Sequence, residues 1–166
     1  TLVATKMSNM GLEKYLNSND INLVRTNVGD RYVVEEMKKG GFNLGGEQSG
    51  HIIMSDFSTT GDGLVAALQF IAAMQRNQRS ASELLNVYDL HPQLLKNVQV
   101  SGDINPLTDS RIIKLIKDIE KKFGEKGRLY IRQSGTEPLI RVMGEHEDEV
   151  TLDHSINEII EQIKIL

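Results

Sequence analysis

The chain has 166 residues, of which 39% are hydrophobic and 25% are charged, as is typical of a globular protein. It contains no cysteine, which excludes disulfides and thiolate sites and fits the cytoplasmic location that we expect. A net charge of −4 and an aromatic content of 5% argue against nucleic acid as a partner, because such partners require a broad basic surface and stacking rings. No apolar run approaches the roughly 20 residues that span a bilayer, so no membrane partner is expected.

The first half of the chain alternates strand and helix patterns. Strands are predicted over residues 1–7, 21–26 and 51–54, and helices over residues 11–17, 31–39 and 62–76. Gly40 and Gly41 end the second helix, and Thr60 or Asp62 is a suitable N-cap for the third. The third helix is apolar over much of its surface and is expected to be largely buried. The alternation predicts a layered α/β domain over residues 1–88.

The second half has a different pattern, and a non-periodic segment over residues 86–93 marks the boundary. Strands are predicted over residues 94–100, 128–132 and 139–143, and helices over residues 108–123 and 147–165. Each helix has one apolar stripe that predicts a core-facing side: Ile112, Ile116, Ile119 and Phe123 on the first, and Ile156, Ile159, Ile160 and Ile163 on the second. Residues 89–166 therefore predict a small α+β domain with two helices on an antiparallel sheet.

A short polar turn between the last two predicted strands is flanked by arginines. It reads Arg132-Gln133-Ser134-Gly135-Thr136-Glu137-Pro138-Leu139-Ile140-Arg141. Guanidinium forks match phosphate oxygens, with charge-assisted hydrogen bonds worth roughly 1.5–3 kcal/mol each. Gly135 can adopt a positive φ, which would let backbone N–H groups converge on an anion. The segment predicts a phosphate site formed by Arg132, Ser134, Gly135, Thr136 and Arg141.

Glu137 does not fit a phosphate site by itself, because its carboxylate would repel the ligand. We expect it to pair with an arginine and to fix the direction of that side chain. Residues 128–141 contain three arginines and one glutamate, a net charge of +2, which leaves −6 for the rest of the chain. A positive patch on an acidic protein suits a small anionic ligand. The alternative is a polar hairpin turn whose arginines pair with surface acids.

A second candidate site is the segment Gly45-Gly46-Glu47-Gln48-Ser49-Gly50-His51. Its three glycines would allow a ligand to approach the backbone, and Glu47, Ser49 and His51 alternate, so they could project to one side. A carboxylate and a hydroxyl together suit neighbouring sugar hydroxyls. The alternative is a glycine turn in which Glu47 forms a salt bridge and His51 begins a strand. Local chemistry favours neither the sugar-binding loop nor the glycine turn.

The two loops, in this order and about 80 residues apart, resemble the α-D-phosphohexomutase family. Further segments share the resemblance, which covers nearly the whole chain: Met7–Leu12, Val28–Val33 and Thr59–Gly63. It implies most of the third domain, truncated at its N-terminus, and the fourth domain of a four-domain enzyme. Gln48 and the run from Arg141 to Met143 favour the branch of the family that acts on glucosamine phosphates.

The resemblance implies a magnesium-dependent isomerase that converts glucosamine 6-phosphate to glucosamine 1-phosphate through a phosphoserine and a bisphosphorylated sugar. By the same analogy, Glu47 and Ser49 hold sugar hydroxyls, and His51 lies near the catalytic centre. The arginine-flanked turn holds the phosphate that is not reacting. Arg31 is a further ligand candidate, and its alternative is an ordinary surface arginine at the start of a helix.

Two parts of the family's active site are missing from this sequence. There is no phosphoserine loop of the Ala-Ser-His-Asn-Pro kind and no Asp-Gly-Asp-x-Asp-Arg magnesium loop. Gly61-Asp62-Gly63 offers one carboxylate, fewer than such a site needs. We therefore expect a fragment that is inactive alone, has no metal site or bound cofactor, and has His51 as its one catalytic candidate. Its expected partners are a phosphorylated hexosamine and the missing N-terminal domains of the same enzyme.

Two other functions are compatible with the sequence. One is a fragment of a phosphomannomutase or phosphoglucomutase. The other is a non-catalytic module that binds phosphosugars.

Overall fold

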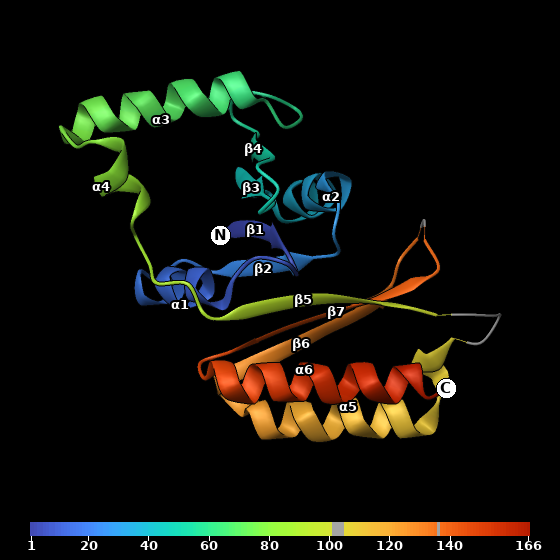
Figure 1. Cartoon of the computed structure of the whole chain (residues 1–166). Helices are drawn as coiled ribbons and strands as arrows, with labels where there is room; N and C mark the ends of the chain where they lie inside the picture. The colour runs from blue at the N-terminus through green and yellow to red at the C-terminus, as the bar shows by residue number, and fades with distance from the viewer. Residues whose placement is uncertain (101–104, 136) are drawn as a thin grey trace. The chain divides into compact units, whose positions relative to one another are not determined.

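The computed structural model describes residues 1–100, 105–135 and 137–166 (Figure 1). The chain divides into two compact units, Thr1–Leu90 and His91–Leu166. The sequence placed the domain boundary after residue 88. Among the described residues, no helix has the length and apolar character needed to cross a membrane.

The first unit is built on a mixed sheet with strand order β2-β1-β3-β4. β1 pairs in parallel with β2 and β3, and β4 runs antiparallel to β3. Its elements follow the order β1 (Leu2–Thr5), α1 (Met10–Ser18), β2 (Leu23–Thr26), α2 (Asp30–Gly40), β3 (Leu44–Gly46), β4 (Ile52–Met54), α3 (Gly63–Asn77) and α4 (Ala81–Leu85).

Helix α2 covers one face of this sheet, and the core of the unit lies between them. Val33 and Met37 of α2 pack against Val3 and Ile53 of the sheet, and all four side chains are buried. Helix α2 ends at Gly40, and its C-cap Gly41 adopts the left-handed conformation, as the glycine pair predicted. The predicted α/β layering is confirmed.

The structure corrects the sequence-based expectations for this unit at three elements. Strand β3 includes residues 45 and 46, where a glycine-rich loop over residues 45–50 was expected, and α4 was not predicted. Helix α3 was expected to be largely buried, but none of its residues is buried. Its start was predicted correctly, since the carboxylate of Asp62 accepts hydrogen bonds from the backbone N–H groups of Leu64 and Val65; Thr60, the alternative, is not the cap.

The second unit is an antiparallel sheet with strand order β5-β7-β6, covered on one face by α5 and α6 (Figure 1). Its elements are β5 (Gln93–Gln99), the 3-10 turn η1 (Pro106–Thr108), α5 (Ser110–Phe123), the 3-10 turn η2 (Gly124–Lys126), β6 (Gly127–Gln133), β7 (Leu139–His146) and α6 (Glu149–Lys164). The predicted α+β arrangement is confirmed.

Both predicted helix stripes of the second unit face its core. Seven of the eight residues are buried, and Ile116 is partly buried against the same cluster. The sheet contributes alternate residues to this core, including Val98, Ile140 and Val142. The other face of the same strands carries the arginines of the predicted phosphate site.

Candidate functional site

The predicted phosphate site lies at the turn between β6 and β7. The hairpin register places Arg132 directly opposite Arg141, so both side chains leave the same face of the sheet from neighbouring positions. The N–H of Ser134 donates to the carbonyl oxygen of Leu139 at 2.8 Å, which continues the ladder into the turn. The structure therefore brings Arg132, Ser134 and Arg141 together at one end of the hairpin. Thr136 lies outside the described residues.

Arg141 and Glu137 form the ion pair that the sequence predicted. Arg141 Nη2 lies 3.4 Å from Glu137 Oε2, and both side chains are partly exposed. The Nε of Arg141 is buried and has no hydrogen-bond partner among the described residues. A guanidinium group has five N–H donors and Glu137 contacts one nitrogen of Arg141, so donors remain for the oxygens of a phosphate.

The positive patch is smaller than the sequence suggested, because Arg128 does not belong to it. The hairpin register places Arg128 opposite Glu145, at the end of the hairpin away from the turn. Its Nε donates to the buried carboxylate of Glu145, which also accepts a hydrogen bond from Gln93 at 2.8 Å. The turn itself has two arginines and Glu137, a net charge of +1 rather than +2.

The backbone of Gly135 corrects another expectation. Its φ lies outside the positive region on which the predicted backbone nest depends. A Cβ added at Gly135 would meet no atom within 4 Å, so the space beside this residue is open. The glycine leaves room for a ligand, and the arginines are the main feature that favours an anion.

The predicted sugar-binding loop is the tight turn between β3 and β4. The N–H of Glu47 donates to the carbonyl oxygen of His51 at 2.9 Å, and the N–H of Gly50 donates to the carbonyl oxygen of Glu47 at 3.0 Å. Gly50 has a φ of 98°, a conformation that favours glycine. Glu47, Ser49 and His51 therefore lie together on one turn.

Only one of the three glycines in this loop leaves open space. A Cβ on Gly45 would lie 2.6 Å from Met37 Sδ and 2.7 Å from Val33 Cγ1 of α2, and a Cβ on Gly46 would lie 2.7 Å from the His51 carbonyl oxygen. Gly45 thus allows α2 to pack on the sheet and does not serve the approach of a ligand. The sequence predicted that all three glycines admit a ligand, and this holds for Gly50 alone.

The carboxylate of Glu47 is held from both sides. Its Oε1 accepts a hydrogen bond from the backbone N–H of Gly29 at 2.9 Å, and its Oε2 lies 3.8 Å from His51 Nδ1. The Oγ of Ser49 lies 3.0 Å from the same nitrogen. The Glu47 side chain is 10% exposed and that of His51 is 58% exposed. The contact with His51 agrees with the alternative interpretation of this loop, in which Glu47 forms a salt bridge.

Sequence reasoning missed the donor that orients Glu47, namely Gly29. Gly29 follows β2 and Glu47 follows β3, and these parallel strands have their carboxyl ends at one edge of the sheet. The chain leaves β1 for β2 and then crosses back to β3 on the other side, which makes this edge a topological switch point, where α/β proteins bind ligands. A hollow of about 330 Å³ lies at this edge and is lined by Lys6, Arg25, Thr26, Asn27, Tyr32, Glu35 and Glu36.

Arg31 and Asp62 have structural roles in the first unit. Arg31 is exposed, forms an ion pair with Glu35 at 3.5 Å and lies 4.8 Å from the ring centroid of Tyr32, as the surface-arginine alternative predicted. Asp62 uses its carboxylate to cap α3. The described residues contain no group of three side chains that could hold a metal ion.

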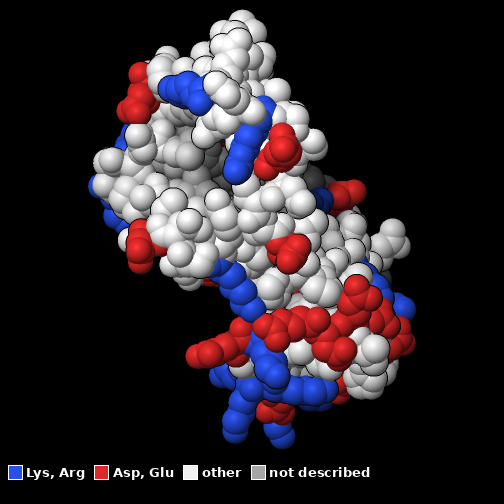
Figure 2. Space-filling model, turned by 90° about the vertical axis from the view of Figure 1, so that its left-hand side faces the viewer, with Lys and Arg blue, Asp and Glu red and all other residues white. Residues whose placement is uncertain are grey.

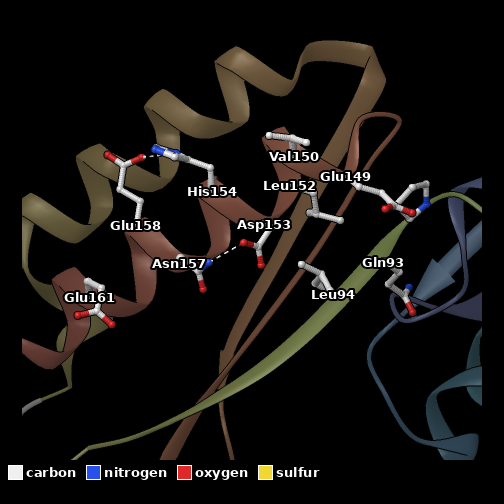
Figure 3. Close-up of a pocket in the computed structure, with 11 residues that line it drawn as sticks. Gln93, Leu94, Glu149, Val150, Leu152, Asp153, His154, Asn157, Glu158 and Glu161 are labelled. Carbon is white, nitrogen blue, oxygen red and sulfur yellow. Dashed lines mark hydrogen bonds and ion pairs between the residues drawn. The ribbon is translucent and has the colours of Figure 1, made fainter.

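A broad groove in the second unit lies away from the arginine turn. It has a volume of about 1110 Å³ and runs between the start of β5 and the outer side of α6 (Figure 3). Its lining includes Glu149, Asp153, Glu158 and Glu161, so it would repel a phosphate. Its polar groups bond to one another, as in the hydrogen bond from Asn157 to Asp153 at 2.8 Å.

Comparisons with known proteins bear on both units. The family model described as phosphoglucomutase/phosphomannomutase, alpha/beta/alpha domain III, matches residues 1–91, and the model of the C-terminal domain matches residues 95–162. The phosphoglucosamine mutases of Roseobacter denitrificans and Cereibacter sphaeroides are 54% and 56% identical over 162 and 164 residues. These alignments cover 98% and 99% of this chain but only 36% and 37% of the relatives.

Solved structures show the same fold at lower identity. An N-acetylphosphoglucosamine mutase of Aspergillus fumigatus is 18% identical, with a TM-score of 0.82 over 99% of this chain and 38% of that protein. The match of both family models over most of the chain confirms the resemblance seen in its two loops. Its residues match domain III and the C-terminal domain of these enzymes. The chain belongs to the phosphoglucomutase/phosphomannomutase family of α-D-phosphohexomutases.

Proposed function

We propose that this chain is the C-terminal part of a phosphoglucosamine mutase and that it recognises the sugar and the distal phosphate. The observation that carries the proposal is the placement of Arg132 opposite Arg141 at the end of the hairpin, with the Nε of Arg141 unpartnered among the described residues. The identity of 54–56% to phosphoglucosamine mutases supports the choice of substrate. A fragment of a phosphomannomutase or phosphoglucomutase is not favoured by these relatives.

In this proposal each loop recognises one kind of chemical group. Arg132 and Arg141 donate to oxygens of the phosphate that is not reacting, Ser134 and Gly135 line the same turn, and the hydroxyl of Thr136, which follows in the sequence, is a further candidate donor. Such charge-assisted contacts contribute roughly 1.5–3 kcal/mol each.

The other loop binds the sugar ring. Gly29 holds one oxygen of the Glu47 carboxylate, so that its second oxygen can accept from sugar hydroxyls, and Ser49 and His51 lie beside it. This chain's residues bind and orient the substrate.

The chemical steps belong to the rest of the enzyme. The whole enzyme would convert glucosamine 6-phosphate to glucosamine 1-phosphate through a phosphoserine and a bisphosphorylated intermediate, with Mg²⁺ held by residues that this chain lacks. A related Aspergillus fumigatus enzyme has been solved in complex with GlcNAc-6P and magnesium. The chain alone should therefore have no mutase activity, because phosphoryl transfer requires the donor and the positioned metal. Turnover by the chain with magnesium and a bisphosphate primer would contradict the proposal.

An NMR titration tests the phosphate half of the site. Inorganic phosphate and glucosamine 6-phosphate should both shift the amide resonances around residues 133–135, with dissociation constants on the order of millimolar. Arg141→Ala should raise the dissociation constants of both ligands by about tenfold or more, because it removes a charge-assisted contact. Arg111→Ala, a matched change at an exposed arginine of α5, should leave both titrations unchanged. Equal binding by the parent and by Arg141→Ala would contradict a phosphate site at this turn.

A second variant tests the sugar half. Glu47→Ala should weaken the binding of glucosamine 6-phosphate and leave the binding of inorganic phosphate unchanged, since inorganic phosphate contacts only the arginine turn. If the variant binds the sugar phosphate as well as the parent does, Glu47 has no role in sugar recognition.

A further inference from the structure

Strand β5 is an open edge of the sheet in the second unit. Among the described residues it pairs only with β7, and it is the outermost strand in the order β5-β7-β6. The N–H of Val100, directly after β5, donates to the carbonyl oxygen of Pro138 at 3.0 Å, so the even-numbered residues of this strand bond toward β7. The backbone groups of Leu95, Asn97 and Gln99 therefore point away from β7.

The backbone groups of these three residues have no partner strand. No hydrogen bond from a described residue reaches their N–H groups, and the three residues are exposed. An edge of this kind can accept a further strand, and many proteins recognise extended peptides in this way. Strand β5 spans seven residues, which gives room for an added strand of ordinary length.

The broad groove of the second unit lies between the start of β5 and the outer side of α6 (Figure 3). Leu94 and Val150 give it an apolar wall, and Val150 is 76% exposed. The described residues that line it include no lysine or arginine but four carboxylates: Glu149, Asp153, Glu158 and Glu161. Figure 2 shows a band of Asp and Glu side chains across the second unit, in the lower part of the view. The groove therefore suits an occupant that is both apolar and basic.

Lys96 shows that the outer side of α6 binds a lysine carried by a strand. Its Nζ donates to Asp153 Oδ1 at 3.0 Å and to Asn157 Oδ1 at 2.7 Å. A strand added outside β5 would lie about 4.8 Å further out, with alternate side chains on the same face as Lys96. Basic side chains at those positions would be directed toward the carboxylates that Lys96 does not reach.

Two carboxylates of the groove remain for such side chains. Glu161 is paired with Lys164 at 2.8 Å. Glu149 forms no ion pair within the described part of the chain, and Glu158 has only a contact of 3.9 Å with the ring of His154. The groove thus keeps negative charge that its own lysines do not neutralise.

We propose that this groove binds an extended, basic segment of another protein, which adds to β5 as a fourth strand. Its alternate side chains point toward α6, with an apolar one against Leu94 and Val150 and basic ones near Glu149 and Glu158. The inference rests on the edge and the charge of the second unit. It goes beyond the proposed function, because the arginine turn has no part in it.

A synthetic peptide with blocked ends, Lys-Thr-Leu-Thr-Lys-Thr-Lys, is the probe, and amide hydrogen exchange of this chain is the measurement. Saturating peptide should slow exchange at Leu95, Asn97 and Gln99 by about tenfold or more. Exchange at Lys96 and Val98 should change little, since their N–H groups already face β7. Unchanged exchange at the three outward amides with millimolar peptide would overturn the proposal.

N-methylation of the peptide separates strand addition from a general attraction between charges. An added strand bonds to β5 through alternate residues only. Methylation of one alternating set of peptide nitrogens should therefore abolish binding, and methylation of the other set should leave it intact. Binding that tolerates both sets, or neither, would overturn strand addition.

Charge substitutions test the role of the groove. The variant Glu149→Gln, Glu158→Gln should raise the dissociation constant of the peptide by about threefold or more, because two carboxylates near its lysines are lost. The matched control Glu120→Gln, Glu125→Gln removes the same charge from exposed positions outside the groove and should leave the constant unchanged. Equal weakening by both variants would show a response to net charge alone, and the proposal would fail.

Two further measurements complete the test. Inorganic phosphate should bind the parent and both charge variants equally, which separates this proposal from the proposed function. Sedimentation of the chain alone over a range of concentrations should show no dimer that protects the outward amides. Such a dimer would assign the edge of β5 to a second copy of the chain and would overturn the proposal.

Discussion

In the arginine-flanked turn, single residues decide whether the proposed phosphate ligand can bind. Arg132 and Arg141 lie opposite each other, and Glu137 holds one nitrogen of Arg141 without occupying its Nε. Gly135 lies between them in an open space, and its φ lies outside the positive region. We propose that its lack of a side chain matters to the phosphate ligand and not to the fold.

Substitution of Gly135 separates these two roles. Gly135→Ala should keep the melting temperature of the parent, since its Cβ meets no atom within 4 Å and its φ is accessible to alanine. The variant should bind inorganic phosphate more weakly, because the added methyl group occupies the space beside the backbone. Calorimetric unfolding and NMR titration check the two statements. Unchanged phosphate binding would indicate that the ligand contacts only the arginine side chains.

Asp109, the N-cap of α5, gives a prediction on pH. Its carboxylate accepts hydrogen bonds from the guanidinium of Arg111 at 2.9 and 3.0 Å and from the Arg111 backbone N–H at 2.8 Å. The side-chain hydrogen bond and then the backbone one lower the pKa of Asp109 from 3.8 to about 2. Because the pKa is lower in the folded state, this cap stabilises the fold above about pH 4, and the contribution is lost as the pH falls toward 2.

Arg111→Met should raise the pKa of Asp109 toward its usual value of 3.8, since the larger cause of the shift is removed. The carboxyl carbon resonance of Asp109, followed from pH 6 to pH 1.5, measures the midpoint. An identical midpoint in the variant and the parent would assign the low pKa to the backbone hydrogen bond alone.

At the scale of elements, α3 and α6 show that an apolar helix is not always a core helix. Both have apolar residues at helical spacing. Six residues of α6 are buried against the sheet and α5, whereas none of α3 is buried. The stability of the second unit should therefore depend on the buried side of α6.

The variant Ile159→Ala should lower the free energy of unfolding of the second unit by about 2–5 kcal/mol, because it leaves a cavity at a fully buried position. Val150→Ala, on the exposed side of the same helix, should change it by less than about 0.5 kcal/mol. Urea unfolding followed by circular dichroism gives both values. Equal losses in the two variants would show that the outer side of α6 is packed as well.

At the scale of the whole molecule, the two units differ in the size of their cores. Within the described residues, eleven buried hydrophobic residues form the core cluster of the second unit, and four form the cluster under α2 in the first. The link between them contains no helix or strand from Asn86 to Pro92. We propose that residues 1–88 and 89–166 are the two domains.

The first unit should therefore unfold at a lower urea concentration than the second. In hydrogen exchange at increasing urea, the amides of β1 and α2 should exchange at lower concentrations than those of β7 and α6, because less apolar surface is buried around them. Limited proteolysis should first cleave within residues 86–93. A single transition with equal protection in all four elements, or first cleavage inside α3, would contradict two independent domains.

The sequence by itself predicted most of the elements, the two helix stripes and the grouping of candidate residues into two loops. These features depend on spacing along the chain, and spacing is visible in a sequence. The ion pair between Arg141 and Glu137 belongs here, since four positions separate them across one turn.

The tertiary structure decided what depends on distant partners. Arg128 pairs with Glu145 at the end of the hairpin away from the arginine-flanked turn, and Glu47 is oriented by Gly29, eighteen positions earlier. Gly45 is needed by α2 and not by a ligand. The exposure of α3 likewise depends on what lies over it, because periodicity shows that a helix has an apolar side but not which element covers that side.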